Sequence, residues 1–228
     1  MRVSPGSQSR RSSLPDLEPQ ARQFAVEVGS LLNRTICDGI RVGAVLTPRG
    51  VIVGKGVGKQ KFSAEAVPVT ISRADPKCWL LVAHTFLLDD EGVYLTAAKS
   101  LYTLYLDEEQ TQMVFHYDYD RSPANRYPQA HFQINGSSPN LEALAERNGF
   151  DRELLRYHFP VGGKRYRPTL EDVIEFMIVE GLADARPGWE DAIAEGRETW
   201  HAAQLLAAVR RDEPMVRQFL GLPRTPDN

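Results

Sequence analysis

The chain has 228 residues, 42% of them hydrophobic, which is enough for one large domain with a sizeable core. A formal net charge of −3 argues against a protein that coats DNA nonspecifically. No apolar run reaches the roughly 20 residues that a membrane-spanning helix needs. The two cysteines, Cys37 and Cys78, lie far apart and match no metal-ligand spacing, which favours reduced thiols. We therefore expect a globular cytoplasmic protein without a membrane segment.

The first 19 residues are rich in Ser, Pro and Arg and are predicted to be a disordered tail. The pair Arg10 and Arg11 resembles part of a twin-arginine export signal, but no apolar region follows it. Residues 20–228 are expected to form a single domain.

An amphipathic helix is predicted over 20–33, because Phe24, Val28, Leu31 and Leu32 recur at helical spacing. From 40 to 135 the chain changes to short runs rich in Val, Ile, Thr, Tyr and Phe that are separated by turn signals. Seven strands without intervening helices indicate an antiparallel sheet. The predicted strands are 40–47, 51–55, 67–72, 78–88, 93–106, 113–120 and 129–135.

Helical patterns return after Gly136, so the region 140–220 is expected to be rich in helix. A short helix is predicted over 141–148, and a stronger one begins after Thr169, which can cap it together with Asp172 in a capping box. A long helix over 187–211 and a short segment over 214–220 complete the chain. The fold class is α+β, with the helices covering one face of the sheet.

Candidate chemistry lies on the predicted hairpin 113–135. Because side chains alternate along a strand, His116 and Asp118 point away from the aromatic side chains between them. His131 likewise points to the opposite face of its strand from the neighbouring Phe132. If both apolar sides enter the core, the two histidines meet on the other face. A shift of one residue in strand pairing would separate them.

Three interpretations of this hairpin remain open. His116 and His131 can act as catalytic acid and base with Asp118 as the orienting carboxylate, since histidine titrates near neutral pH. Two imidazoles and a carboxylate are also an ordinary ligand set for a divalent metal. The third interpretation is a solvent-exposed strand face with polar cross-strand pairs. No cofactor is expected.

A second cluster lies in the basic segment 156–168, which surrounds a Gly-Gly turn. Its cations can neutralise phosphates and its tyrosines can stack on bases, which suits phosphate or single-stranded nucleic acid. Alternatively its arginines pair with the acidic Glu171, Asp172 and Glu175 of the following helix. The predicted phosphate and nucleic-acid contacts are Lys164, Arg165, Tyr166 and Arg167.

Residues 113–178 loosely resemble the TumE family of bacterial toxins and neighbouring uncharacterised bacterial families. The resemblance is carried by the run Tyr117-Asp118-Tyr119-Asp120, by His131 on the next strand, and by Lys164-Arg165-Tyr166-Arg167-Pro168-Thr169-Leu170-Glu171-Asp172 before an apolar helix. It implies a toxin of a toxin-antitoxin module or a related defence protein that acts on RNA or another translation component, with a cognate antitoxin as partner. The alternative is a non-catalytic binding protein. Whether the protein is an enzyme stays open at this point.

Overall fold

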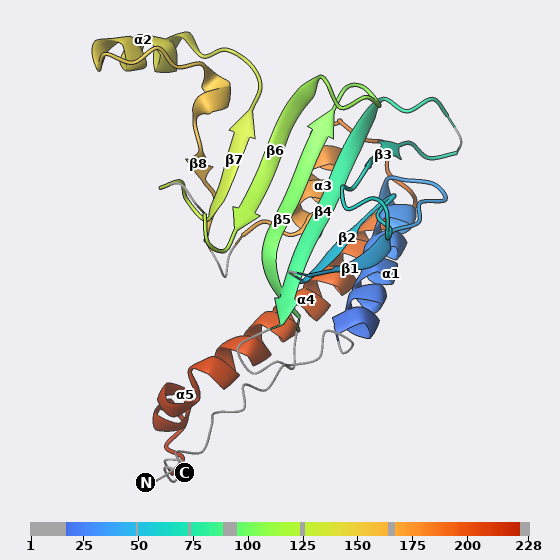
Figure 1. The fold of residues 1–228 in the computed structure, drawn as a ribbon, viewed down its shortest axis with the longest axis vertical. Coiled ribbons are helices and arrows are strands. Elements are labelled where there is room, and N and C mark those ends of the chain that lie inside the picture. Colours follow the sequence, from blue (N-terminus) through green and yellow to red (C-terminus); the bar gives the residue numbers. More distant parts are fainter. Residues whose placement is uncertain are drawn as a thin grey trace, which may run out of the picture.

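The computed structural model describes residues 17–223, apart from residues 49, 73, 89–94, 124–125 and 164–166. The described residues form the predicted α+β fold with an antiparallel sheet, which has eight strands instead of the predicted seven (Figure 1). The strands are β1 (Gly43–Thr47), β2 (Gly50–Gly54), β3 (Ala66–Val69), β4 (Cys78–Leu88), β5 (Leu95–Tyr105), β6 (Met113–Asp120), β7 (Ala130–Ile134) and β8 (Phe159–Pro160).

The sheet order is β1-β2-β4-β5-β6-β7-β8, and β3 pairs with β4 beside β2. Strands β4 and β6 begin and end where the sequence predicts, because both are long runs bounded by turn signals. Strand β8 was not predicted. It has two residues and therefore offers no alternating pattern, and only its pairing with β7 identifies it as a strand.

The helices are α1 (Leu17–Thr35), α2 (Pro139–Arg147), α3 (Leu170–Val179), α4 (Trp189–Arg211) and α5 (Glu213–Phe219), with one 3-10 turn, η2 (Leu154–Arg156). Helix α1 begins three residues before the predicted start at Gln20. Pro19 is compatible with this, because the first turn of a helix needs no backbone N–H from proline. The predicted disordered tail is therefore too long by three residues, and its remainder, 1–16, lies outside the described residues.

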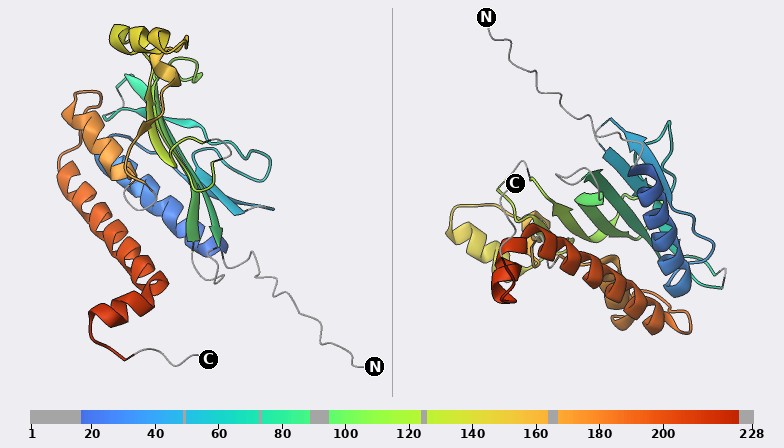
Figure 2. Two further views of the ribbon diagram at one scale, coloured as in Figure 1. Left: turned by 90° about the vertical axis from the view of Figure 1, so that its left-hand side faces the viewer. Right: turned by 90° about the horizontal axis from the view of Figure 1, so that it is seen from below.

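Helices α1, α3 and α4 lie on one side of the sheet, which we call the inner face (Figure 2). The main core fills the space between them. Its buried residues come from α1, α3 and alternate positions of the central strands, and include Leu32, Ile36, Leu80, Val82, Leu104, Phe115, Val173, Ile174 and Met177. The opposite side of the sheet is the outer face.

Helix α3 begins with the predicted capping box. The backbone N–H of Thr169 donates to Asp172 Oδ2 at 2.8 Å, and the backbone N–H of Asp172 donates to Thr169 Oγ1 at 3.2 Å. These reciprocal bonds satisfy N–H groups that a helix start otherwise leaves unpaired. They fix the residue at which α3 begins on the inner face.

Helix α2 does not cover the inner face, and for this helix the prediction is wrong. It lies beyond the end of β7, away from the other helices (Figure 1). Ala145 is its one buried residue among those described, so α2 has no apolar stripe to place on the sheet. The chain returns from α2 through η2, which contacts β7, to form the edge strand β8.

Within the described ranges, none of the helices combines the length and the apolar character needed to cross a membrane.

Candidate functional site

The pairing of β6 with β7 sets the histidine positions. Asp118 lies opposite His131, and His116 lies opposite Gln133. Residues directly opposite each other in an antiparallel pair point to the same face. Both histidines therefore share the outer face, as the alternation of the strands predicts, and their ring centroids are 6.1 Å apart. Their catalytic role stays a prediction.

A short relay of hydrogen bonds fixes the protonation pattern of His116. The side-chain amide of Gln133 donates from Nε2 to the carbonyl oxygen of Leu155 in η2 at 2.5 Å. Its Oε1 therefore faces His116 Nε2, at 2.7 Å. Because that oxygen only accepts, Nε2 of His116 must carry the proton. In the neutral ring, Nδ1 is then the nitrogen with a free lone pair.

In His131 it is Nδ1, not Nε2, that bonds a fixed acceptor. Its Nδ1 lies 3.1 Å from the carbonyl oxygen of Pro128, which can only accept, so Nδ1 carries a proton. Its Nε2 lies 3.8 Å from Asp118 Oδ2. The role of Asp118 as the orienting carboxylate stays a prediction. The His131 side chain is 8% exposed, whereas that of Asp118 is 35% exposed.

Two further aromatic side chains complete what we call the histidine cluster: His116, Asp118, Tyr127, His131 and His158. The ring of His158, just before β8, lies 4.7 Å from that of His131. Tyr127 stacks on His158 with centroids 3.6 Å apart and ring planes 10° apart.

Neither Tyr127 nor His158 was assigned to the hairpin site from the sequence. One signal could have found His158. The triplet Tyr157-His158-Phe159 repeats the pattern of Phe115-His116-Tyr117, a histidine between two aromatic residues. Phe159 indeed pairs with Phe132 on β7, which places His158 on the outer face.

Burial weakens the basicity of two cluster histidines. It lowers the pKa of His116 from 6.5, against smaller opposing effects of the Gln133 hydrogen bond and the Asp118 charge. It also lowers the pKa of His158, and the charge of nearby His131 acts in the same direction. Both rings are therefore predominantly neutral at pH 7.

The basic segment does not join this cluster through Arg167. The Arg167 guanidinium lies 4.4 Å from the ring centroid of Tyr119 and 6.0 Å from that of Trp200 on α4. Tyr119 is a buried inner-face residue of β6, so Arg167 lies on the opposite side of the sheet from His116. Its role as a phosphate contact stays a prediction. The other three predicted contacts, Lys164, Arg165 and Tyr166, lie outside the described residues.

Two acidic residues of α3, Asp172 and Glu175, pair with an arginine of α4 that the sequence analysis did not consider. Arg197 of α4 donates to Asp172 Oδ1 at 2.8 Å and also bonds Glu175. These ion pairs join α3 to α4. Arg165 of the basic segment lies outside the described residues, so its pairing with these carboxylates stays a prediction.

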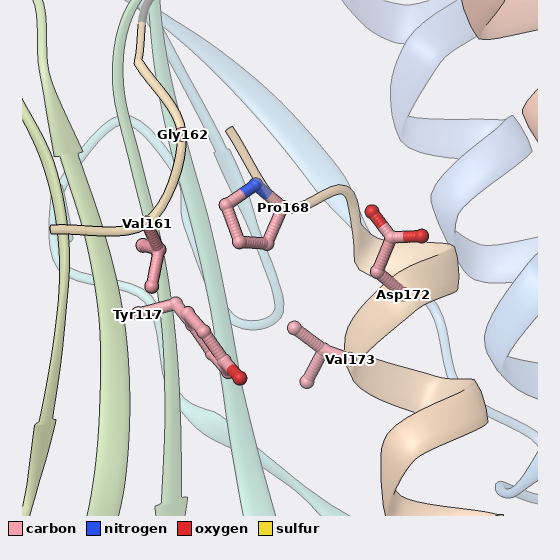
Figure 3. Close-up of a pocket in the computed structure, with 6 residues that line it drawn as sticks. All are labelled: Tyr117, Val161, Gly162, Pro168, Asp172 and Val173. Atoms are coloured by element: carbon pink, nitrogen blue, oxygen red, sulfur yellow. The ribbon is translucent and has the colours of Figure 1, made fainter. Parts of the chain in front are cut away.

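A separate cavity of about 280 Å³ lies on the inner face between β6 and α3 (Figure 3). Its one carboxylate, that of Asp172, is already bonded to the Thr169 backbone and to Arg197. The sheet separates this cavity from the histidines, because its Tyr117 points to the inner face and the adjacent His116 to the outer one. The lining residues are Tyr117, Val161, Gly162, Pro168, Asp172 and Val173.

Metal binding at the hairpin receives no support. Among the residues that the structure describes, no three His, Cys, Asp or Glu side chains are grouped so that they could hold a metal ion. No protein-family model, no curated protein and no solved structure matches this chain, so the resemblance to the TumE family stays an expectation from its motifs.

Proposed function

We propose that the protein cleaves RNA by general acid–base catalysis with His116 and His131. One observation carries the proposal: the ring centroids of His116 and His131 lie 6.1 Å apart. In each ring one nitrogen is bonded to a fixed acceptor, Nε2 of His116 to Gln133 and Nδ1 of His131 to Pro128, so the second nitrogen is the one that can transfer a proton. RNA suits such a site because it brings its own nucleophile, the 2′-hydroxyl. A pair of proton-transfer groups is then sufficient for chemistry.

In the proposed reaction, Nδ1 of His116 accepts the proton of the 2′-hydroxyl. The 2′-oxygen attacks the adjacent phosphorus, forming a P–O2′ bond as the P–O5′ bond breaks. Nε2 of His131, on the side of the ring that faces Asp118, donates a proton to the leaving 5′-oxygen. The products are a 2′,3′-cyclic phosphate and a free 5′-hydroxyl, and the enzyme has moved one proton from His131 to His116. Solvent restores both histidines.

The lowered pKa of His116 supports its assignment as the base. A base must be unprotonated at the working pH, and the ring is neutral near pH 7. His131 is then the acid, with Asp118 beside it as the orienting carboxylate, since Asp118 Oδ2 lies 3.8 Å from His131 Nε2.

The resemblance of 113–178 to the TumE family supports the same reading. We extend the proposal to a bacterial toxin that acts in the cytoplasm and is held in check by a cognate antitoxin protein. Arg165 and Arg167 were predicted to contact phosphates. Since Arg167 lies on the inner face, any contact it makes would be with a part of the RNA that passes around the sheet edge.

The test uses purified protein and a labelled single-stranded RNA, in buffer with and without a chelator. Each of His116→Ala and His131→Ala is expected to reduce cleavage by about 10²- to 10⁴-fold. His201→Ala is the matched control, because His201 is an exposed histidine of α4 outside the cluster. His116→Gln retains an N–H for Gln133 and separates loss of catalysis from loss of folding.

Two results would contradict the proposal. One is the lack of RNA cleavage by the wild-type protein under every condition. The other is cleavage of a strand with 2′-deoxyribose at the scissile position, since the proposed nucleophile would then be absent. Loss of cleavage with chelator alone would redirect the assignment to metal chemistry.

A second candidate function, partner binding, is favoured by the exposed apolar side chains of the segment 205–222. This segment projects from the body of the molecule (Figure 1). Its exposed apolar residues are Leu205, Leu206, Val209, Met215, Phe219, Leu220 and Leu222. Exposed apolar side chains gathered in one segment of the chain are found at many protein contacts. Light scattering over a range of concentrations, for wild type and Phe219→Glu, tests self-association, and co-expression with a candidate antitoxin tests binding of a partner.

A further inference from the structure

Tyr127 is an exposed aromatic ring with one face already occupied. Its ring lies nearly parallel to that of His158, with centroids 3.6 Å apart, yet 46% of the residue is exposed. A ring stacked on one side and open to solvent on the other offers a flat surface for a further ring.

This surface adjoins the proposed catalytic pair. The ring of His158 lies 4.7 Å from that of His131, and the Tyr127 ring lies 6.4 Å from it. A nucleotide whose phosphate lies at His131 would therefore have its own or a neighbouring base within reach of Tyr127. The separation of successive nucleotides in a strand, about 3.4 Å when stacked and more when extended, is compatible with this arrangement.

The electrostatics of the surface favour an uncharged ring as its occupant. Burial and the charge of His131 lower the pKa of His158, so the imidazole under Tyr127 is neutral near pH 7. The positive charge of Arg152 lies close enough to contribute to this lowering. Arg152 also lies 5.5 Å from the ring centroid of Tyr157, the residue before His158.

We propose that Tyr127, backed by His158, is a stacking subsite for one unpaired nucleobase next to the phosphate bound at His116 and His131. The substrate class is then single-stranded RNA, because a base within a duplex is already stacked and cannot present its face to Tyr127. This inference rests on the proposed function and adds a subsite to the same site. Tyr127 is a binding residue in this scheme and takes no part in proton transfer.

The experiment separates binding from cleavage. Fluorescence anisotropy is measured with a labelled single-stranded RNA whose 2′-hydroxyls are methylated, so that it cannot be cleaved by the proposed reaction. Wild type, Tyr127→Ala and Tyr127→Phe are compared at one fixed salt concentration, because phosphate contacts depend on salt. Phe62→Ala is the matched control, since Phe62 is also about half exposed but lies far from the cluster in sequence, in the loop between β2 and β3.

Tyr127→Ala is expected to weaken binding roughly tenfold, while Tyr127→Phe and Phe62→Ala bind as wild type does. Replacing each nucleotide of the strand in turn by an abasic one should reveal one position at which Tyr127→Ala has no further effect. A duplex of the same sequence should bind more weakly and should not respond to Tyr127→Ala.

The possible failures are distinguishable. If wild type cleaves RNA with the expected dependence on His116 and His131, but Tyr127→Ala leaves binding and KM unchanged, the subsite is wrong and the proposed function stands. If the strand binds with the expected Tyr127 dependence but RNA is not cleaved, the subsite stands and the catalytic proposal is wrong. If Tyr127→Phe binds as weakly as Tyr127→Ala, the hydroxyl rather than the ring is responsible, and stacking is overturned. Lack of binding by wild type also overturns the subsite.

Discussion

The two faces of the β6–β7 hairpin differ in role: the inner face packs in the core and the outer face carries polar side chains. Neighbouring residues of one strand point to the two faces. Phe115 on the inner face is 2% exposed and packs against Tyr117, Phe132 and Phe176. His116, the next residue, takes part in a polar relay on the outer face. Strand alternation thus separates the residues that stabilise this sheet from those that are available for chemistry.

The largest expected effect concerns this neighbouring pair. Phe115→Ala removes a fully buried ring from the core and is expected to lower the free energy of unfolding by about 3–5 kcal/mol. His116→Gln replaces one donor by another and is expected to change it by about 1 kcal/mol or less. Urea unfolding measures both. Equal losses of stability would show that the two faces are not separate in function.

A smaller effect distinguishes the buried histidine of the inner face from the histidine cluster. Burial lowers the pKa of His84 from 6.5 to about 3, and the charge of Arg167 acts in the same direction. As the pH falls below about 6.5, His84 therefore binds a proton in the unfolded chain but stays neutral in the folded protein. Stability is unaffected by His84 above that pH and falls as the pH drops from about 6.5 towards 3.

In His84→Phe, the part of the acid-induced loss of folding stability that is due to His84 should disappear. Between pH 7 and pH 5 we expect the substitution to remove about 2 kcal/mol of acid destabilisation, since one pKa unit corresponds to about 1.4 kcal/mol. The aromatic neighbours Phe24, Phe86 and Tyr102 provide a site for the new ring. Urea unfolding at the two pH values measures the difference, and an unchanged pH dependence would exclude His84 as its source.

The smallest predicted effect is a shift in the pH profile of a variant at Gln133 on the outer face. In Gln133→Glu, a carboxylate replaces the amide oxygen that accepts from His116 Nε2, and an opposite charge raises the pKa of an imidazole. If His116 is the base, the rising limb of the pH profile of kcat/KM moves to higher pH by about one unit, or about 1.4 kcal/mol.

In the wild type this limb is expected below pH 6.5, because burial lowers the pKa of His116. Gln133→Leu is the companion variant, which removes the acceptor without adding charge and should not move the limb upward. A limb that stays in place in Gln133→Glu would indicate that another group is the base.

The features that the sequence predicts well are local. The bounds of β4 and β6 follow from turn signals at their ends, and the capping box of α3 from the spacing of Thr169 and Asp172. The common face of His116 and Asp118 follows from strand alternation. The α+β class follows from the succession of strands and then helices.

Other parts of the site depend on contacts between residues far apart in the sequence. The amide of Gln133 is oriented by Leu155, 22 residues later, across a turn that no periodicity marks. Tyr127 and His158 come together from a loop and from the residue before a two-residue strand. Arg167 was predicted to contact phosphates as part of the basic segment, and the structure places it on the inner face, away from the histidines.

Which side chains of each strand share a face follows from the sequence, because alternation is a property of one strand. That Asp118 lies opposite His131 follows from the tertiary fold, since the register depends on how two strands pair across a loop. The tertiary fold also brings His158 and Tyr127, rather than Arg167, beside the two histidines. The physical reason is that the edge strand β8 continues the sheet next to β7, whereas the chain beyond it crosses to the inner face to begin α3.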